Sequence, residues 1–73
     1  MFKIDDVFNW FITEGMGNTL QDLKDICEER TMYIKDGLIS GYNLGECLRN
    51  VYGNEEEVDY IWSKILRDIR ILD

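Results

Sequence analysis

The chain has 73 residues, of which 45% are apolar and 32% charged, and its 15 acidic and 8 basic residues give a net charge of −7 without any histidine. This length allows one small domain at most, and the apolar content is too high for a disordered chain. The negative charge repels nucleic-acid phosphates and anionic membranes, so direct binding to either is disfavoured. We therefore expect one folded domain over residues 1–73, whose acidity suits solubility or a basic partner.

The first expected element is a helix over residues 4–14. Its apolar side chains recur at helical spacing, at Ile4, Val7, Phe8 and Phe11. Asp5 and Asp6 stand in or just before the first turn, where a helix favours negative charge. Gly15 offers a C-terminal stop.

The next segment allows two interpretations. An apolar stripe advances by steps of three or four residues through Leu20, Leu23, Cys27, Thr31, Ile34 and Leu38. We favour one long helix over residues 19–36 that ends near Gly37 or Gly41, because the periodicity continues without a break. The alternative is a small β-hairpin within residues 31–42, because Asp36–Gly37 between two short apolar runs is a hairpin signal.

A third helix is expected over residues 43–52. Asn43 stands at its start with Glu46 three residues later, which is the pattern of a capping box. The apolar stripe consists of Leu44, Cys47, Leu48 and Val51. Gly53 ends the helix.

The last helix follows Asn54, which can cap it. The acidic run 55–57 occupies its first turn, and three cations lie toward its negative end, at Lys64, Arg67 and Arg70. Its apolar stripe consists of Val58, Trp62, Ile65, Ile69 and Leu72, with Ile61 beside it, and we expect Trp62 to be buried. We interpret the acidic run first as helix chemistry, with a binding role as the alternative. The four segments predict an all-α fold, a small bundle of about four short helices.

Cys27 and Cys47 are the two cysteines. No signal peptide precedes them, and no apolar run approaches the ~20 residues of a membrane span. We therefore expect a cytoplasmic protein in which both are free thiols that serve as small apolar residues. A disulfide between them is the alternative.

The sequence carries no catalytic or metal-binding signature. Without histidine there can be no Ser–His or Cys–His pair. There is no Cys-x-x-Cys pair, and the acidic run after Gly53 lacks the central glycine of a calcium loop. We expect no enzyme activity, no cofactor and no metal.

Three features are candidates for partner binding. An acidic stripe lies opposite the apolar face of the long helix, at Asp22, Asp25, Glu29 and Asp36. This stripe is either a solvated face or an imitation of a phosphate backbone. Trp10 points away from the first apolar stripe and Tyr60 lies on a polar face, so either could anchor a partner; the alternative for Trp10 is that its helix is buried on two sides. Arg30 lies near the apolar side, where it either pairs with a carboxylate such as Glu46 or joins a dimer seam.

In size, acidity and its Pro-free composition rich in Ile, Asn, Glu and Asp, the chain resembles the small acidic proteins of phages and mobile elements that inhibit a host enzyme stoichiometrically. This resemblance rests on general character and on no motif. It implies a non-enzymatic protein that binds a nucleic-acid-handling or defence enzyme through that enzyme's basic surface. The alternatives are a self-associating helical module whose last helix forms a homodimer, and a DNA-binding transcriptional regulator. The regulator is disfavoured by the net charge and by Asp68 among the cations.

Overall fold

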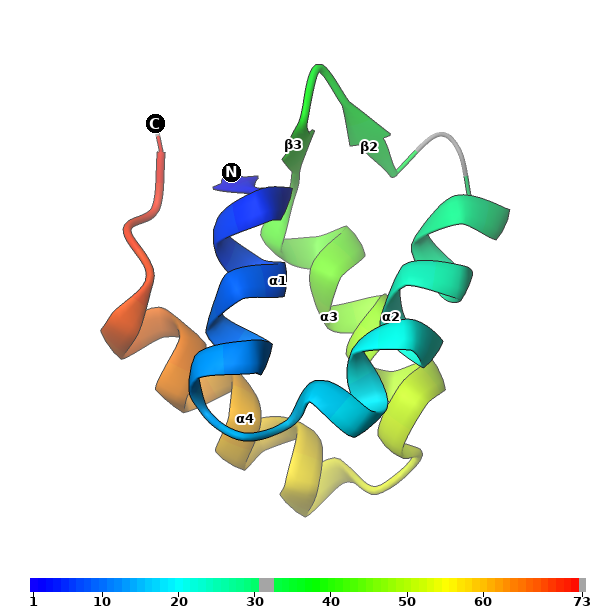
Figure 1. Cartoon of the computed structure of the whole chain (residues 1–73), viewed down its shortest axis with the longest axis vertical. Helices are drawn as coiled ribbons and strands as arrows, with labels where there is room; N and C mark the ends of the chain where they lie inside the picture. Colours follow the sequence, from blue (N-terminus) through cyan, green and yellow to red (C-terminus); the bar gives the residue numbers. More distant parts are fainter. Residues whose placement is uncertain (31–32, 73) are drawn as a thin grey trace.

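The computed structural model describes residues 1–30 and 33–72. It contains four helices and a small three-stranded sheet (Figure 1). The helices are α1 (Ile4–Thr13), α2 (Gly17–Glu29), α3 (Gly41–Tyr52) and α4 (Glu55–Asp68), and the strands are β1 (Phe2–Lys3), β2 (Ile34–Lys35) and β3 (Leu38–Ile39). The prediction of a mostly helical fold with four short helices is therefore confirmed.

The end of α1 shows why Gly15 stops this helix. Gly15 has a φ of +76°, a conformation that glycine adopts without a steric penalty. Its N–H donates to the carbonyl of Ile12 at 3.2 Å, and the N–H of Met16 donates to the carbonyl of Phe11 at 2.8 Å. These two bonds form a Schellman motif, which satisfies carbonyls that the helix leaves free.

The long second helix predicted over residues 19–36 is wrong, and the hairpin alternative holds for the described residues. Helix α2 ends at Glu29, and residues 31 and 32, which include Thr31 of the predicted stripe, lie outside the described residues. Asp36 and Gly37 have φ values of 56° and 75°, as a two-residue type I′ turn requires, and they connect β2 to β3.

Pairing with the first strand explains why the hairpin prevails over the helical period. The sheet order is β1-β3-β2, with both pairs antiparallel. One face carries an apolar row toward the core, composed of Phe2, Ile39 and Ile34, and the other carries Lys3, Leu38 and Lys35. A helix through these residues would leave Phe2 without the partner strand that covers it.

The start of α3 also differs from the prediction. Ser40, which directly follows β3, is its N-cap, and its hydroxyl accepts a hydrogen bond from the N–H of Asn43 at 3.1 Å. Asn43 is therefore the third helical residue rather than the cap. Glu46 pairs with Arg49 in place of the expected capping box. Gly53 ends the helix as predicted, in the left-handed conformation at φ 69°.

The start of α4 agrees with the prediction. The side-chain oxygen of Asn54 accepts hydrogen bonds from the N–H groups of Glu56 and Glu57, at 2.9 and 3.2 Å. The acidic run occupies the first turn, as expected for the positive end of a helix. The helix itself ends at Asp68, so Arg70 stands beyond it.

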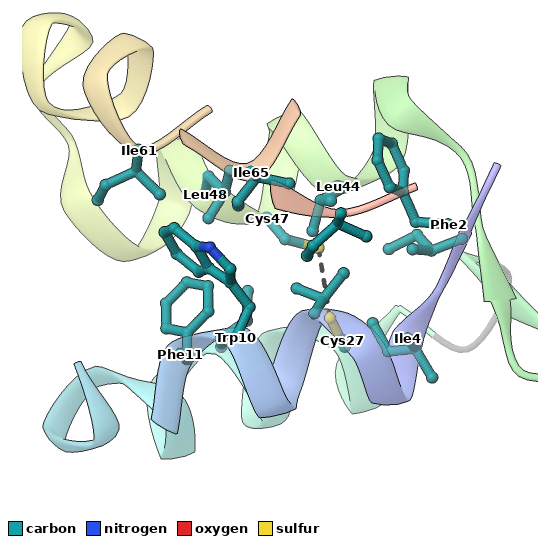
Figure 2. Packing of buried hydrophobic residues seen from close by; sticks show 14 of the residues in the cluster. Phe2, Ile4, Trp10, Phe11, Cys27, Leu44, Cys47, Leu48, Ile61 and Ile65 are labelled. Atoms are coloured by element: carbon teal, nitrogen blue, oxygen red, sulfur yellow. Dashed lines mark hydrogen bonds between the residues drawn. The ribbon is translucent and has the colours of Figure 1, made fainter. Parts of the chain in front are cut away.

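The core lies where the three helix pairs α1–α2, α2–α3 and α3–α4 pack together and where the sheet closes one end. Its residues with no exposed surface are Val7, Phe11, Leu23, Ile39, Leu44, Cys47, Leu48 and Ile65. Figure 2 shows the Trp10 ring pointing from α1 toward Leu48 and Ile61. Helix α1 is thus buried on two sides, toward α2 and toward α4.

Trp62 is less buried than its apolar stripe predicted, whereas for Trp10 the alternative of a helix buried on two sides holds. Trp10 is 7% exposed and belongs to the core, whereas Trp62 is only partly buried at its edge. The Trp62 ring packs edge-on against Phe2, with ring centroids 5.7 Å apart. Trp62 thus covers the sheet from outside instead of filling the centre of the bundle.

The two ends of the described chain lie side by side. The N-terminal ammonium of Met1 donates to the carbonyl of Leu72 at 2.7 Å, and the N–H of Leu72 donates back to the carbonyl of Met1 at 2.7 Å. The segment after α4 therefore continues along the start of β1 (Figure 1). Among residues 1–30 and 33–72, none of the helices has the length and apolarity needed to cross a bilayer.

Candidate interaction surfaces

Helix α2 presents three of the four predicted acidic residues to solvent. Asp22, Asp25 and Glu29 are exposed and share the face opposite buried Leu20 and Leu23. The carboxylate of Asp25 accepts a hydrogen bond from the Gln21 amide at 2.9 Å. Within the described part of the chain, none of the three forms an ion pair within 4.0 Å. We call these three residues the α2 acidic face.

Asp36 does not belong to this face, which corrects the predicted stripe. It is exposed, but it sits in the β2–β3 turn, away from the helix. Its neighbours there are Lys35 and, across the sheet, Lys3, which both flank Leu38. The prediction included Asp36 because it extended the helix to residue 36. Helix α2 ends at Glu29, so Asp36 is not on its face.

Most of the cations are already engaged by other side chains of the protein. Arg49 pairs with Glu46 at 3.1 Å and with Glu55 at 3.2 Å, and Arg67 pairs with Asp68 at 2.9 Å. Three further cations lie over aromatic rings, namely Lys24 over Phe8, Lys64 over Tyr60 and Arg30 over Tyr33. The α2 acidic face therefore has no cation of its own held against it among the described residues.

Arg30 lies over an aromatic ring instead of pairing with a carboxylate of the described residues, and its place in a dimer seam stays a prediction. Its guanidinium carbon lies 5.8 Å from the Tyr33 ring centroid, as in a cation–π contact. The expected pairing with Glu46 is wrong, since Glu46 pairs with Arg49 instead.

Trp10 is held inside the protein rather than offered to a partner. Its indole Nε1–H donates to the Asp68 carboxylate at 2.9 Å, which joins α1 to the end of α4. The pKa of Asp68 is lowered to about 2. The hydrogen bond from Arg67 is the largest cause, and the hydrogen bond from Trp10 is the second. Because only 7% of Trp10 is exposed, its ring is a structural anchor, and of the two interpretations of Trp10 the one with a helix buried on two sides holds.

Tyr60 lies on the outer face of α4, as predicted. It is 63% exposed, and the Lys64 ammonium stands 5.2 Å from its ring centroid. Such i,i+4 contacts are common on exposed helix faces. The ring is available for contact but is not part of the α2 acidic face.

A groove between α3 and α4 was missed by the sequence reasoning. It encloses about 330 Å³ and is lined by Gly41, Tyr42, Gly45, Arg49, Val58, Asp59 and Trp62. Tyr42 is 76% exposed, and a side-chain carbon on Gly41 would approach the Trp62 ring at 3.6 Å. The signal in the sequence was Gly41 and Gly45, one helical turn apart, which leaves one face of α3 bare.

A second cleft lies between α1 and the end of α4 and encloses about 390 Å³. Its lining combines carboxylates with the Trp10 edge and one cation, and includes Asp6, Glu14, Asp68 and Arg70. No group of three or more Cys, Asp or Glu side chains placed to hold a metal ion occurs among residues 1–30 and 33–72.

Comparison with known protein families, with curated proteins and with solved structures finds no significant match for this chain. Three surfaces suit contact with another molecule: the α2 acidic face, which has no ion pair among the described residues, the exposed Tyr60 on α4 and the groove between α3 and α4.

Proposed function

We propose that this chain is a non-enzymatic protein that acts by binding a protein partner with a basic surface, and that the α2 acidic face makes the contact. The observation that carries the proposal is that Asp22, Asp25 and Glu29 are exposed on one helix face and form no ion pair with any residue of 1–30 and 33–72. Unpaired carboxylates attract a basic partner and speed its association.

The dimensions of the face limit the size of the contact. The seven-residue step from Asp22 to Glu29 spans about 10 Å of helix at 1.5 Å per residue. One DNA strand carries a phosphate about every 3.4 Å along the axis. Three charges over this length therefore resemble a few phosphates of one strand, which suits a local basic patch rather than a long nucleic-acid channel.

A basic patch of this kind is typical of enzymes that handle nucleic acids. A small acidic protein that occupies the patch would act as a stoichiometric inhibitor by competing with the phosphate backbone. This class of function agrees with the net charge of −7 and with the resemblance to small acidic proteins of phages and mobile elements.

The alternative, a homodimer formed through α4, has less exposed apolar surface available for the contact. Val58 and Ile65 of the predicted stripe, and Ile61 beside it, are already buried inside the protein. A dimer would need to use the outer residues of this helix, such as Leu66, which are interspersed with charges.

The test starts from affinity capture of a partner from lysate of the native host, followed by binding measurements on the purified pair. Asp22→Asn, Asp25→Asn and Glu29→Gln together should weaken binding about tenfold or more, at roughly 0.5 kcal/mol per exposed charge. Wild-type binding should also weaken as salt rises.

The matched control changes Asp6→Asn, Glu14→Gln and Glu56→Gln, which removes the same total charge away from α2. This control should bind within about twofold of the wild type at physiological ionic strength. Equal losses in the two triple variants would show that only total charge matters. Binding that strengthens with salt, or a concentration-dependent homodimer in place of a partner, would favour the self-association alternative.

A further inference from the structure

The two cysteines meet in the core between α2 and α3. Their sulfur atoms are 3.7 Å apart, and the thiol of Cys27 donates a hydrogen bond to Sγ of Cys47 (Figure 2). Cys27 is 2% exposed and Cys47 is fully buried, and both are free thiols. The sequence predicted two free thiols that serve as small apolar residues, with a disulfide as the alternative, and the structure shows free thiols in contact.

The geometry lies close to that of a disulfide. A disulfide requires a sulfur–sulfur distance of about 2.05 Å, so the sulfurs need to approach by less than ~2 Å. Rotation about the two Cα–Cβ bonds moves the sulfur atoms over distances of this order. Both cysteines sit on helices that pack against each other, and this packing holds the sulfurs near each other in the folded protein.

Cys27 can be reached from a surface cavity, and the pKa values of the two thiols differ. Cys27 lines a cavity of about 400 Å³, together with Asp5, Phe8, Lys24, Glu28 and Ile34. The hydrogen bond from Cys27 and the nearby Arg30 charge lower the pKa of Cys47, whereas that hydrogen bond and burial raise the pKa of Cys27. The thiolate, which is the reactive form, is therefore favoured on Cys47.

We propose that Cys27 and Cys47 form a site of reversible oxidation, at which a peroxide converts the two thiols into a disulfide that links α2 to α3. The Cys27 thiol, which lines the cavity, passes its proton along the hydrogen bond to the Cys47 thiolate as its sulfur attacks one peroxide oxygen. The O–O bond breaks, and the released hydroxide takes that proton back from Cys47 to form water. The Cys47 thiolate then attacks the sulfur of the Cys27 sulfenic acid. The S–S bond forms, the S–O bond breaks, and the departing hydroxide becomes a second water with a proton from solvent.

The cross-link acts on the part of the chain that the two cysteines enclose. This part includes the β2–β3 hairpin and the first turns of α3. The two cysteines are 20 positions apart in the sequence. Closing the loop between them restricts the unfolded chain, so the oxidised protein should melt roughly 10–20 °C higher than the reduced one. Reduction by a dithiol should reverse the shift.

The experiment treats the purified full chain with hydrogen peroxide, quenches it, unfolds it and alkylates any free thiol with iodoacetamide. Intact mass should show a monomer that is lighter by two hydrogens and carries no alkyl groups, and peptide mapping should locate the Cys27–Cys47 link. The thermal transition of the same sample should shift upward and return after treatment with dithiothreitol.

The single variants Cys27→Ala and Cys47→Ala are the controls, and neither should show an upward shift after peroxide. If these variants fail to fold, the mapped wild-type link and its reversible thermal shift still decide the question. Full alkylation of both cysteines after peroxide, added oxygen atoms without a link, or a disulfide that joins two chains would each overturn the proposal.

Discussion

The hydrogen bond from Trp10 to Asp68 gives an acceptor to the one polar group of a side chain that lies in the core. The indole fills the space between α1 and α4, and its single N–H points outward to a carboxylate that Arg67 also contacts. A buried indole without an acceptor would cost free energy. Asp68 thus allows Trp10 to be buried on the second side of α1, as the alternative interpretation of this residue expected.

Asp68 should make the stability of the protein depend on acid pH. Its folded pKa of about 2 lies below the ordinary value near 3.9, so the carboxylate is favoured by folding. This contribution is complete above about pH 5 and is lost as the pH falls through the folded pKa. Asp68→Asn should therefore reduce the fall in melting temperature between pH 5 and pH 2.

Trp10→Phe provides the matched variant for this pH series, because it removes one of the two donors and keeps a ring in the core. Its pH dependence should lie between those of the wild type and Asp68→Asn. A melting temperature that falls equally steeply in the wild type and in Asp68→Asn would contradict the assignment.

At the scale of elements, the caps of α3 and α4 can be tested as a pair. Ser40→Ala and Asn54→Ala should each lower the free energy of unfolding by about 1 kcal/mol, since each removes the acceptor for an N-terminal N–H. Asn43→Ala should cost close to nothing, because Asn43 lies inside the first turn of α3. Urea unfolding curves measure the free energy of unfolding of all three variants.

The opposite result would show that Asn43 is the cap, as the sequence pattern predicted. In that case Asn43→Ala would lower the free energy of unfolding strongly and Ser40→Ala would leave it unchanged. The asymmetry between the two variants is therefore the measurement that decides where α3 begins.

Local signals in the sequence predicted most of the helical elements. The apolar spacing of Val7 and Phe11, the stops at Gly15 and Gly53 and the cap at Asn54 all act within a few residues, so they can be read from the chain alone. The acidic residues Asp22, Asp25 and Glu29 were likewise placed correctly on one exposed face, because that part of α2 keeps its helical phase.

The errors arose where a distant segment decided the structure. The chain from Ile34 onward forms a hairpin because β1 pairs with β3, and two residues at the start of the chain give no warning of this. Asp36 left the predicted stripe for the same reason. The contact between Cys27 and Cys47 also depends on how α2 packs on α3, which periodicity does not specify.

The hairpin error changes how Asp36 should be used in experiments. Its φ of 56° lies in the left-handed region, which Asp and Asn tolerate better than most other residues. Reversing its charge with lysine would disturb the turn as well as the surface. Binding experiments therefore belong on the α2 acidic face, where substitutions leave the backbone conformation unstrained.

At the level of the whole molecule, the strand order β1-β3-β2 indicates which contacts form early and which form late during folding. The helix contacts α1–α2, α2–α3 and α3–α4 all join neighbours along the chain, and the β2–β3 hairpin is local as well. The pairing of Phe2 with Ile39, by contrast, closes a loop of about half the chain. Loop closure of this kind costs entropy before it returns any contact.

Strand β1 should therefore dock late in folding. Phe2→Leu, with an expected cost of about 1 kcal/mol, should raise the unfolding rate about fivefold and leave the folding rate nearly unchanged. Ile65→Val, of similar cost within the helical core, should instead slow folding measurably. Stopped-flow kinetics in urea separate the two, and a Phe2 variant that mainly slows folding would show that β1 belongs to the folding nucleus.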